Sequence, residues 1–362
     1  MTSNHSLCDV AGELASSNGY KIVLIAKIFV CVIGVFVFSC YVIFKPAYLW
    51  HHVHARICAK YHLVSAFFFN MGSLGILVFN LTRSVFARNS QDPCSYLIDP
   101  STKFWLSFIF LFLLFQQTVS LLLLAVERTV STARISSYEN CESRVHVLVI
   151  VAATSAAIFT ALITTMLRTP ELSVYREVEI MSSTQCFYVL LAIIVVLGII
   201  TVILAQITYL LNVKYRRSYR IEETRNTEFT NRLSAVFQIE ENLSMIRIVL
   251  PVSYIHLLIV TFSVAGLLAY DLLDHDSCSN VFDATIKEAM LITPFYSIGL
   301  PSVLTWHWPG VFWRVVRVFS CQKIVKEVPL TGVTVVPVAQ QREIYFAGLK
   351  NTFEAAVTKR RS

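Results

Sequence analysis

The chain has 362 residues, of which 56% are hydrophobic and only 15% are charged, whereas charged residues make up about 25% of soluble domains. The mean hydropathy is +0.63, which argues against a soluble globular protein. A net charge of +7 is modest for a chain of this length, so we expect membrane lipids and no nucleic acid among its partners.

Seven apolar runs follow a polar stretch at residues 1–21, and only the first run contains a charged residue, Lys27. The runs cover residues 22–44, 63–81, 104–126, 147–167, 186–213, 248–270 and 289–308. A helix needs about 20 apolar residues to cross a bilayer, and it satisfies its backbone polar groups within the segment. The runs therefore predict an all-α membrane protein with a seven-transmembrane helix bundle at residues 22–308.

The basic residues predict the orientation of this bundle. If the N-terminus lies outside, most of the 30 Lys and Arg residues fall in the inner loops and in the tail, as cytoplasmic segments favour. Residues 1–21 are then extracellular and residues 309–362 cytoplasmic. Asn4 begins an Asn-His-Ser triplet on the predicted outer side, which makes it a candidate glycosylation site.

The connecting loops are predicted to be short, except for residues 214–247. After the last apolar run, residues 311–326 have the pattern of an amphipathic helix that would lie along the membrane surface. Cys321 on this helix is a candidate for palmitoylation, and an unmodified cysteine is an equally open alternative.

Four of the nine cysteines are predicted to lie on the oxidising, outer side: Cys8, Cys94, Cys186 and Cys278. A disulfide between Cys94 and Cys186 would hold the second outer loop over the mouth of the bundle. Cys8 and Cys278 would then form a second disulfide. Four cysteines allow three pairings, so the sequence leaves the connectivity open.

The third apolar run ends in Glu127-Arg128-Thr129. An acid followed by arginine at the inner end of the third of seven helices resembles the Asp/Glu-Arg-Tyr signature of G-protein-coupled receptors. The resemblance implies that Glu127 holds Arg128 at rest, and that Arg128 meets a G protein when the bundle opens. Thr129 departs from the signature. Alternatively, the two charges mark the helix end and extend toward the membrane surface.

A ligand pocket can be proposed on the same helix. At 3.6 residues per turn, Phe110 lies about five turns before Arg128 on the same face, and Leu114 and Gln117 fall close to that face. If Arg128 faces the bundle interior, this face is mostly apolar toward the outside and suits a small hydrophobic ligand. Gln117 could bind the ligand, or it could hydrogen-bond to a neighbouring helix.

Two further features concern the outer ends of the first and last helices. Charges within a membrane are costly and usually have a partner or a function. Lys27 in the first helix could pair with Glu288 at the start of the seventh and contribute to the pocket, or each could extend outward to water. Pro251, Pro294 and Pro301 are expected to kink the sixth and seventh helices.

Several strings carry a more specific resemblance: Ser137-Tyr138-Glu139-Asn140, Leu233 to Asn242, Thr293-Pro294-Phe295-Tyr296 and Gly299-Leu300-Pro301. With Glu127-Arg128, they resemble nematode serpentine chemoreceptors of the alpha superfamily, class alpha-beta. The resemblance implies an olfactory or gustatory receptor in the cilia of sensory neurons, which signals through a heterotrimeric G protein.

Other function classes fit less well. No metal-ligand cluster, phosphate-binding loop or nucleophile motif stands out, so we expect neither an enzyme nor a cofactor. A seven-helix ligand-gated channel or a transporter is the main alternative. Transporters often carry broken helices in matched halves, whereas the helix prolines here gather in the sixth and seventh runs. The sequence thus favours a receptor that binds a small ligand within its bundle.

Overall fold

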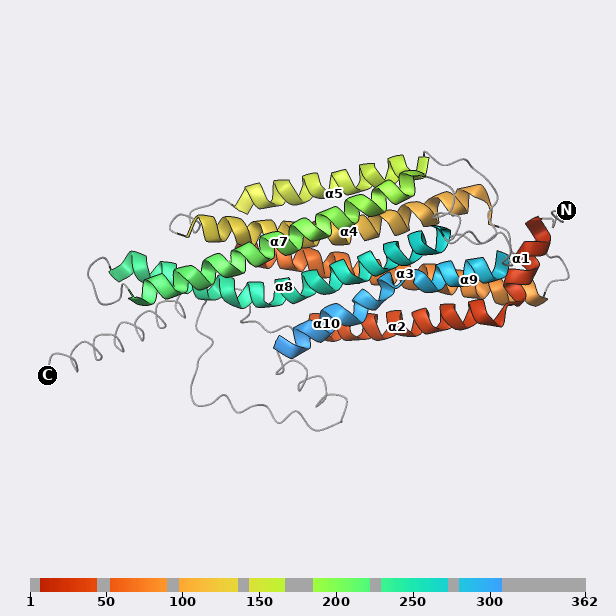
Figure 1. The fold of residues 1–362 in the computed structure, drawn as a ribbon, viewed down its shortest axis with the longest axis horizontal. Coiled ribbons are helices and arrows are strands. Elements are labelled where there is room, and N and C mark those ends of the chain that lie inside the picture. Colours follow the sequence, from red (N-terminus) through yellow and green to blue (C-terminus); the bar gives the residue numbers. More distant parts are fainter. Residues whose placement is uncertain are drawn as a thin grey trace, which may run out of the picture. The chain divides into compact units, whose positions relative to one another are not determined.

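The computed structural model describes residues 7–43, 53–89, 98–135, 143–166, 185–221, 229–272 and 280–307 (Figure 1). All of them belong to the first of two units into which the chain divides, Met1–Val311. The amphipathic helix predicted at residues 311–326 lies outside the described residues.

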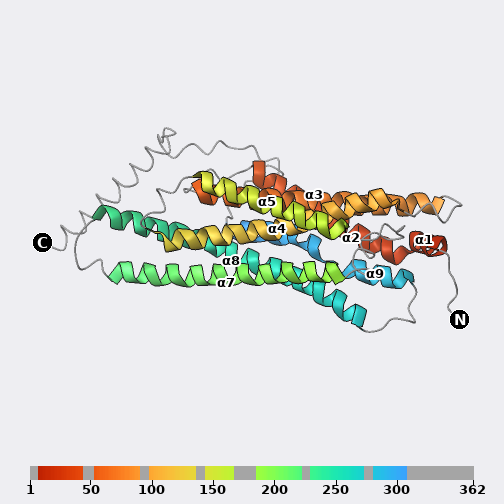
Figure 2. The same ribbon diagram turned by 90° about the horizontal axis from the view of Figure 1, so that it is seen from above.

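The described part of the chain is a bundle of long helices that run side by side (Figures 1 and 2). The elements are α1 (Leu7–Ser16), α2 (Asn18–Ile43), α3 (Val53–Asn89), α4 (Pro100–Ala133), α5 (Ser143–Met166), α7 (Gln185–Ile221), α8 (Phe229–Leu272), α9 (Asn280–Met290), the short 3₁₀ helix η4 (Thr293–Phe295) and α10 (Tyr296–His307).

The helices close into a ring. Neighbours in the chain pack on one another from α2 through α3 to α4, and α10 packs on both α8 and α2. Helix α4 occupies the centre, because it contacts α3, α5, α7 and α8. The first and last helices of the bundle are therefore neighbours, as expected for a closed seven-helix ring.

Five helices contain a stretch that is long and apolar enough to cross a membrane. These stretches are Asn18–Ser39, Ala55–Phe86, Ser101–Ala133, Val189–Ser218 and Ala235–Tyr270. The apolar part of α5 is shorter, Val149–Ile163, and the seventh predicted span is divided between α9 and α10. The prediction of a helical, multi-pass membrane protein is thus confirmed, with five of the seven predicted spans meeting this criterion among the described residues.

The seventh helix is broken rather than merely kinked. Helix α9 ends at Met290, and α10 begins only at Tyr296. Pro294 lies in the break; it has no N–H to donate, and its ring would clash with the carbonyl four residues earlier in a continuous helix. The backbone N–H of Ile292 bonds instead to Ser263 Oγ of α8 at 3.1 Å. Pro251 and Pro301, in contrast, lie inside uninterrupted helices.

The prediction of a long inner loop at residues 214–247 was wrong. Helix α7 continues to Ile221 and α8 begins at Phe229, so helical structure extends well beyond the apolar runs. Arg216 Nε and Glu240 Oε1 lie 2.6 Å apart and join the two extensions. A search for apolar runs misses these extensions of α7 and α8, because they contain many polar and charged residues.

The sequence analysis also missed α1, a helix within the polar segment at residues 1–21. Leu14 and Ala15 are buried in a cluster with Tyr20, Leu24 and other apolar residues of the bundle. Ser84 Oγ of α3 donates to the backbone oxygen of Ala15 at 3.0 Å. The helix is stabilised by this packing, which a reading of local composition cannot detect.

Helix α4 begins with strong local signals. Asp99 is its N-cap, and the carboxylate accepts a hydrogen bond from the backbone N–H of Thr102 at 2.8 Å, while Pro100 occupies the first turn. Both residue types are favoured at these positions. The hydrogen bonds from Thr102 hold the pKa of Asp99 below its usual value.

Close packing around α2 depends on Gly34. A Cβ atom at this position would come within 2.5 Å of Ser297 Cβ and 2.7 Å of Asn70 Nδ2. Small residues allow membrane helices to approach closely, and here the missing side chain lets α10 and α3 reach α2. Gly75 of α3 has no such neighbour, since a Cβ atom there would meet nothing within 4 Å.

These two glycines form a matched pair for a test of packing. We expect Gly34→Ala to destabilise the bundle by about 1–3 kcal/mol, as overpacking does. Gly75→Ala should be neutral or stabilising by up to about 1 kcal/mol, because alanine favours a helix over glycine. Thermal unfolding of the purified protein in detergent measures both. Equal melting temperatures for the two variants would contradict this account of the α2 interface.

Candidate functional site

The predicted signature at the inner end of α4 forms a buried ionic contact. Arg128 is only 1% exposed. Its Nε and Nη2 donate to the two carboxylate oxygens of Glu127, and its Nη1 donates to Asn242 Oδ1 of α8 at 2.8 Å. Arg128 thus faces the bundle interior and joins α4 to α8, instead of extending toward the membrane surface.

Asn242 is the centre of a wider set of contacts, which we name the inner polar cluster: Glu127, Arg128, Ser131, Thr132, Asn212 and Asn242. Ser131 Oγ donates to Asn242 Oδ1 at 3.1 Å, and Asn242 Nδ2 donates to Thr132 Oγ1 at 3.4 Å. Asn212 Nδ2 of α7 reaches the same hydroxyl at 2.7 Å. The cluster therefore connects α4, α7 and α8 at the end predicted to face the cytoplasm.

Thr129 stands where the Asp/Glu-Arg-Tyr signature has tyrosine, and its side chain makes two hydrogen bonds. Its hydroxyl lies 2.9 Å from that of Thr208 on α7, and it also donates to the backbone oxygen of Ala125 at 2.9 Å. The position that follows Arg128 therefore makes a contact between α4 and α7.

Sequence reasoning did not identify Asn242 as a site residue. Asn242 occurs within a family-like string and begins an Asn-Leu-Ser triplet, and nothing in this local pattern distinguishes it from a surface asparagine. In the structure Asn242 is 1% exposed. A polar residue at an apolar-face position of α8 is the signal that could have revealed it, because buried polar groups require partners.

A second set of polar contacts lies farther along α4, which we name the central polar cluster: His62, Gln117, Thr118, Ser120, His256 and Tyr296. His62 Nδ1 is 3.0 Å from Ser120 Oγ, and His62 Nε2 is 2.9 Å from Tyr296 Oη. The cluster therefore joins α3, α4 and α10 in the middle of the bundle.

Two further residues complete this cluster. Gln117 of α4 lies beside the side chain of Tyr296, and its Nε2 has no hydrogen-bond partner among the described residues. His256 of α8 contacts the ring of Tyr296 edge-on, with 5.3 Å between ring centroids, and its Nε2 lies 3.4 Å from Thr118 Oγ1. Tyr296, the first residue of α10, thus meets side chains from α3, α4 and α8.

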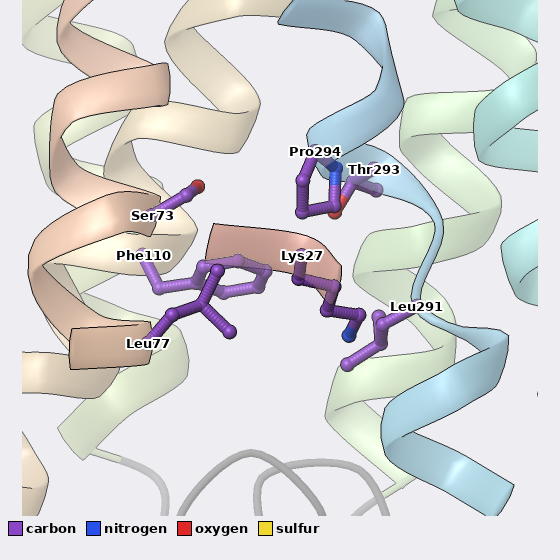
Figure 3. Close-up of a pocket in the computed structure, with 7 residues that line it drawn as sticks. All are labelled: Lys27, Ser73, Leu77, Phe110, Leu291, Thr293 and Pro294. Carbon is purple, nitrogen blue, oxygen red and sulfur yellow. The ribbon is translucent and has the colours of Figure 1, made fainter. Parts of the chain in front are cut away.

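The half of the bundle that is predicted to face outward contains a cavity, which we name the outer cavity. Figure 3 shows its lining residues: Lys27, Ser73, Leu77, Phe110, Leu291, Thr293 and Pro294. The cavity is small, and its empty volume of about 230 Å³ includes space that is open to solvent. The break in the seventh helix supplies three of the seven lining residues, so the broken segment forms one wall.

The proposed pocket residues divide between these regions. Phe110 and Lys27 line the outer cavity, whereas Leu114 is buried in the neighbouring apolar core. Gln117 belongs to the central polar cluster, and Glu288 contacts Lys27. The face of α4 that was predicted to be a single apolar surface therefore has three parts. Phe110 lines the cavity, Leu114 packs in the apolar core, and Gln117 lies in the central polar cluster.

Lys27 and Glu288 form a buried ion pair, one of the two alternatives left open by the sequence. Lys27 Nζ lies 2.5 Å from Glu288 Oε1, with the side chains 5% and 0% exposed. The ammonium also donates to the backbone oxygen of Glu288. A cation is favoured at this C-terminal end of α9 by the helix dipole, and the Glu288 carbonyl also accepts from the backbone N–H of Leu291 at 3.2 Å. Lys287 Nζ lies over the ring of Tyr270 instead, 5.8 Å from its centroid.

Several proposed site residues cannot be placed. Asn4, Cys94, Cys278 and Cys321 lie outside the described residues, as do the side chains of Cys8 and Cys186. Within the described segments, no group of three or more His, Cys, Asp or Glu side chains could hold a metal ion.

The ion pair between α2 and α9 can be tested by exchanging its partners. We expect Lys27→Met or Glu288→Gln alone to destabilise the protein by about 3–5 kcal/mol, since each leaves a buried group without its partner. The double variant Lys27→Glu with Glu288→Lys should recover part of that loss. The melting temperature in detergent measures all three. A double variant less stable than both single variants would show that the pair does not stabilise this contact.

Comparison with known families agrees with the geometry. Residues 5–309 match the family described as serpentine type 7TM GPCR receptor class ab chemoreceptor. The comparison with curated proteins gives no match. The family match covers all seven predicted spans, both polar clusters and the outer cavity, so the chain belongs to the class ab family of serpentine seven-transmembrane chemoreceptors.

Proposed function

We propose that this protein is a chemosensory G-protein-coupled receptor that binds a small, mostly hydrophobic ligand in its helix bundle and activates a heterotrimeric G protein. By resemblance to its family, it would act in olfaction or taste, in the ciliary membrane of nematode sensory neurons. The observation that carries the proposal is the buried contact of Arg128 with Glu127 and Asn242, at the inner ends of α4 and α8.

The proposal includes seven membrane crossings with the N-terminus outside. In this arrangement α5 is the fourth span, and the pair α9 and α10 together forms the seventh. A broken span is tolerated where its free backbone groups find partners in the protein, as Ile292 does with Ser263. Glycosylation at Asn4 and the outer disulfides Cys94–Cys186 and Cys8–Cys278 belong to the same proposal.

The surface of the bundle supports contact with lipid. Large apolar side chains on several helices are strongly exposed, including Phe29 at 66%, Phe86 at 74%, Phe159 at 64% and Phe262 at 64%. Exposed apolar surface of this kind marks an interaction site in a soluble protein. Around a helical bundle it suits the hydrocarbon region of a bilayer.

The two clusters and the outer cavity suggest how ligand binding would reach the G protein. The outer cavity touches Pro294, two residues before Tyr296 of the central polar cluster. A ligand that binds one arrangement of this wall more tightly shifts the population toward that arrangement. We infer that α8 then moves outward at its inner end, which separates Asn242 from Arg128 and frees the arginine for the G protein.

A second cavity gives α8 room for such a movement. It lies between α3, α4, α8 and α10, next to Leu124, Met245 and Val249, and its empty volume of about 370 Å³ includes space that is open to solvent. Closely packed side chains resist displacement, whereas a cavity beside α8 lowers the cost of repacking. This space lies between the central and the inner polar clusters.

Substitutions at Arg128 and Asn242 should have opposite effects. Arg128→Ala removes the group proposed to meet the G protein and should abolish ligand-driven activation. Asn242→Ala removes a hydrogen bond to a charged group, worth about 1.5–3 kcal/mol, and should raise ligand-independent activation by about tenfold. Nucleotide exchange on a co-expressed G protein, normalised to receptor at the cell surface, measures both.

Asn80→Ala is the matched control, because Asn80 is also a buried asparagine but its side chain has no hydrogen-bond partner in the described part of the chain. It should leave the basal exchange rate unchanged. Unaltered activation in Arg128→Ala, or a lower basal rate in Asn242→Ala than in Asn80→Ala, would contradict the proposed coupling mechanism.

A further inference from the structure

The chemistry of the outer cavity indicates what kind of ligand it would accept. Three of its walls are apolar side chains, Leu77, Phe110 and Leu291, and Pro294 closes another side (Figure 3). Three side chains with hydrogen-bond donors, Lys27, Ser73 and Thr293, also line the cavity. The cavity therefore has a mostly apolar lining with a few convergent polar groups, which is typical of small-molecule sites.

One N–H group of the Lys27 ammonium has no acceptor among the described residues. An ammonium group carries three donors, and Glu288 accepts two of them, through its carboxylate and through its backbone oxygen. No acceptor among the described residues takes the third. Because Lys27 lines the outer cavity, this donor is available to a molecule that binds there.

Ser73 supplies the second donor. Its side chain is only 4% exposed, and its hydroxyl has no hydrogen-bond partner among the described residues. Figure 3 shows the hydroxyl pointing from α3 toward the space in front of Pro294. A buried hydroxyl without a partner is costly, so an acceptor atom in the cavity would stabilise this arrangement.

The charges around the outer cavity disfavour an ionised ligand. The carboxylate of Glu288 already neutralises Lys27 at 2.5 Å. A ligand carboxylate beside Lys27 would therefore lie close to a second carboxylate, and a ligand ammonium would lie close to Lys27. Like charges in a poorly solvated site repel strongly. Lys287 faces the ring of Tyr270 and is not part of the lining.

We propose that the outer cavity binds a small uncharged molecule with an apolar chain and one hydrogen-bond-accepting oxygen, as in a short-chain ketone or ester. The oxygen would accept from Lys27 and Ser73, and the chain would pack against Phe110 and Leu77. This inference rests on the proposed receptor function, since it uses the outer cavity as the ligand site. It narrows the ligand from hydrophobic molecules in general to neutral acceptors of small size.

A panel of matched probes tests the ligand class on the unaltered receptor. We suggest methyl butyl ketone, pentanoate, pentylamine and hexane, together with shorter and longer methyl ketones, in the nucleotide-exchange assay. The ketones should activate the receptor best. The charged probes and the alkane, which lacks an acceptor, should be at least tenfold less potent.

Ser73→Ala tests the site itself. Losing one hydrogen bond should raise the half-maximal concentration of the best ketone about three- to tenfold. Ser107→Ala is the matched control: Ser107 on α4 is 1% exposed and also has no hydrogen-bond partner among the described residues, but it does not line the outer cavity. It should leave the potency unchanged.

Three results would overturn the inference: strongest activation by pentanoate or pentylamine, equal potency of hexane and the ketone, or equal effects of Ser73→Ala and Ser107→Ala. The raised basal exchange expected of Asn242→Ala separates this failure from a failure of the receptor proposal. If Asn242→Ala is active and no ketone acts through Ser73, the donors serve water alone and the inference is wrong. If neither the unaltered receptor nor Asn242→Ala drives exchange under any condition, the receptor proposal is wrong as well.

Discussion

The arrangement of the bundle depends on how one permanently charged side chain is buried. Arg128 has a guanidinium that proteins do not deprotonate, and it is 1% exposed between α4 and α8. Such a charge is tolerated only where its donors are satisfied. Glu127 neutralises it, and Asn242 provides the acceptor on α8. In the proposed switch, removing Asn242 would change the balance between two arrangements of α8, because the arginine would have to find another acceptor. This is the physical basis of the proposed switch.

In the half of the bundle predicted to face outward, a second buried charge, that of Lys27, is also neutralised by a partner, Glu288. Pro294 lies in the break between α9 and α10, in the predicted seventh span. The last carbonyls of α9 lie at a helix end, where the Glu288 carbonyl accepts from the Leu291 N–H at 3.2 Å. Lys27 of α2 occupies that helix end and pairs with Glu288. The broken segment, the ion pair and the outer cavity thus lie next to one another. Tyr296 begins α10 immediately after the break and meets His62, so the outer cavity and the central polar cluster share a structural element.

Hydrophobic runs predicted the fold well, because a membrane span is a property of about 20 consecutive residues. The family and the proximity of the first and last helices could also be inferred from the sequence, whereas the interior position of Arg128 was one of two open alternatives. Features that depend on distant partners could not be inferred. Helix α1 exists because Leu14 and Ala15 meet α2 and α3 side chains, and the inner extensions of α7 and α8 are joined by Arg216 and Glu240. Asn242 resembles an ordinary loop asparagine until α4 is placed beside it.

The central claim is that α8 separates from α4 at their inner ends when the receptor activates a G protein. Double electron–electron resonance between labels at Ala133 and Val236 measures that separation directly. The labels would be introduced as unnatural amino acids, since the chain has nine cysteines. The account predicts a longer distance when nucleotide-free G protein is bound, and a growing long-distance population in Asn242→Ala without it. A distance distribution that is the same in all three states would contradict the proposed role of the contact between Arg128 and Asn242.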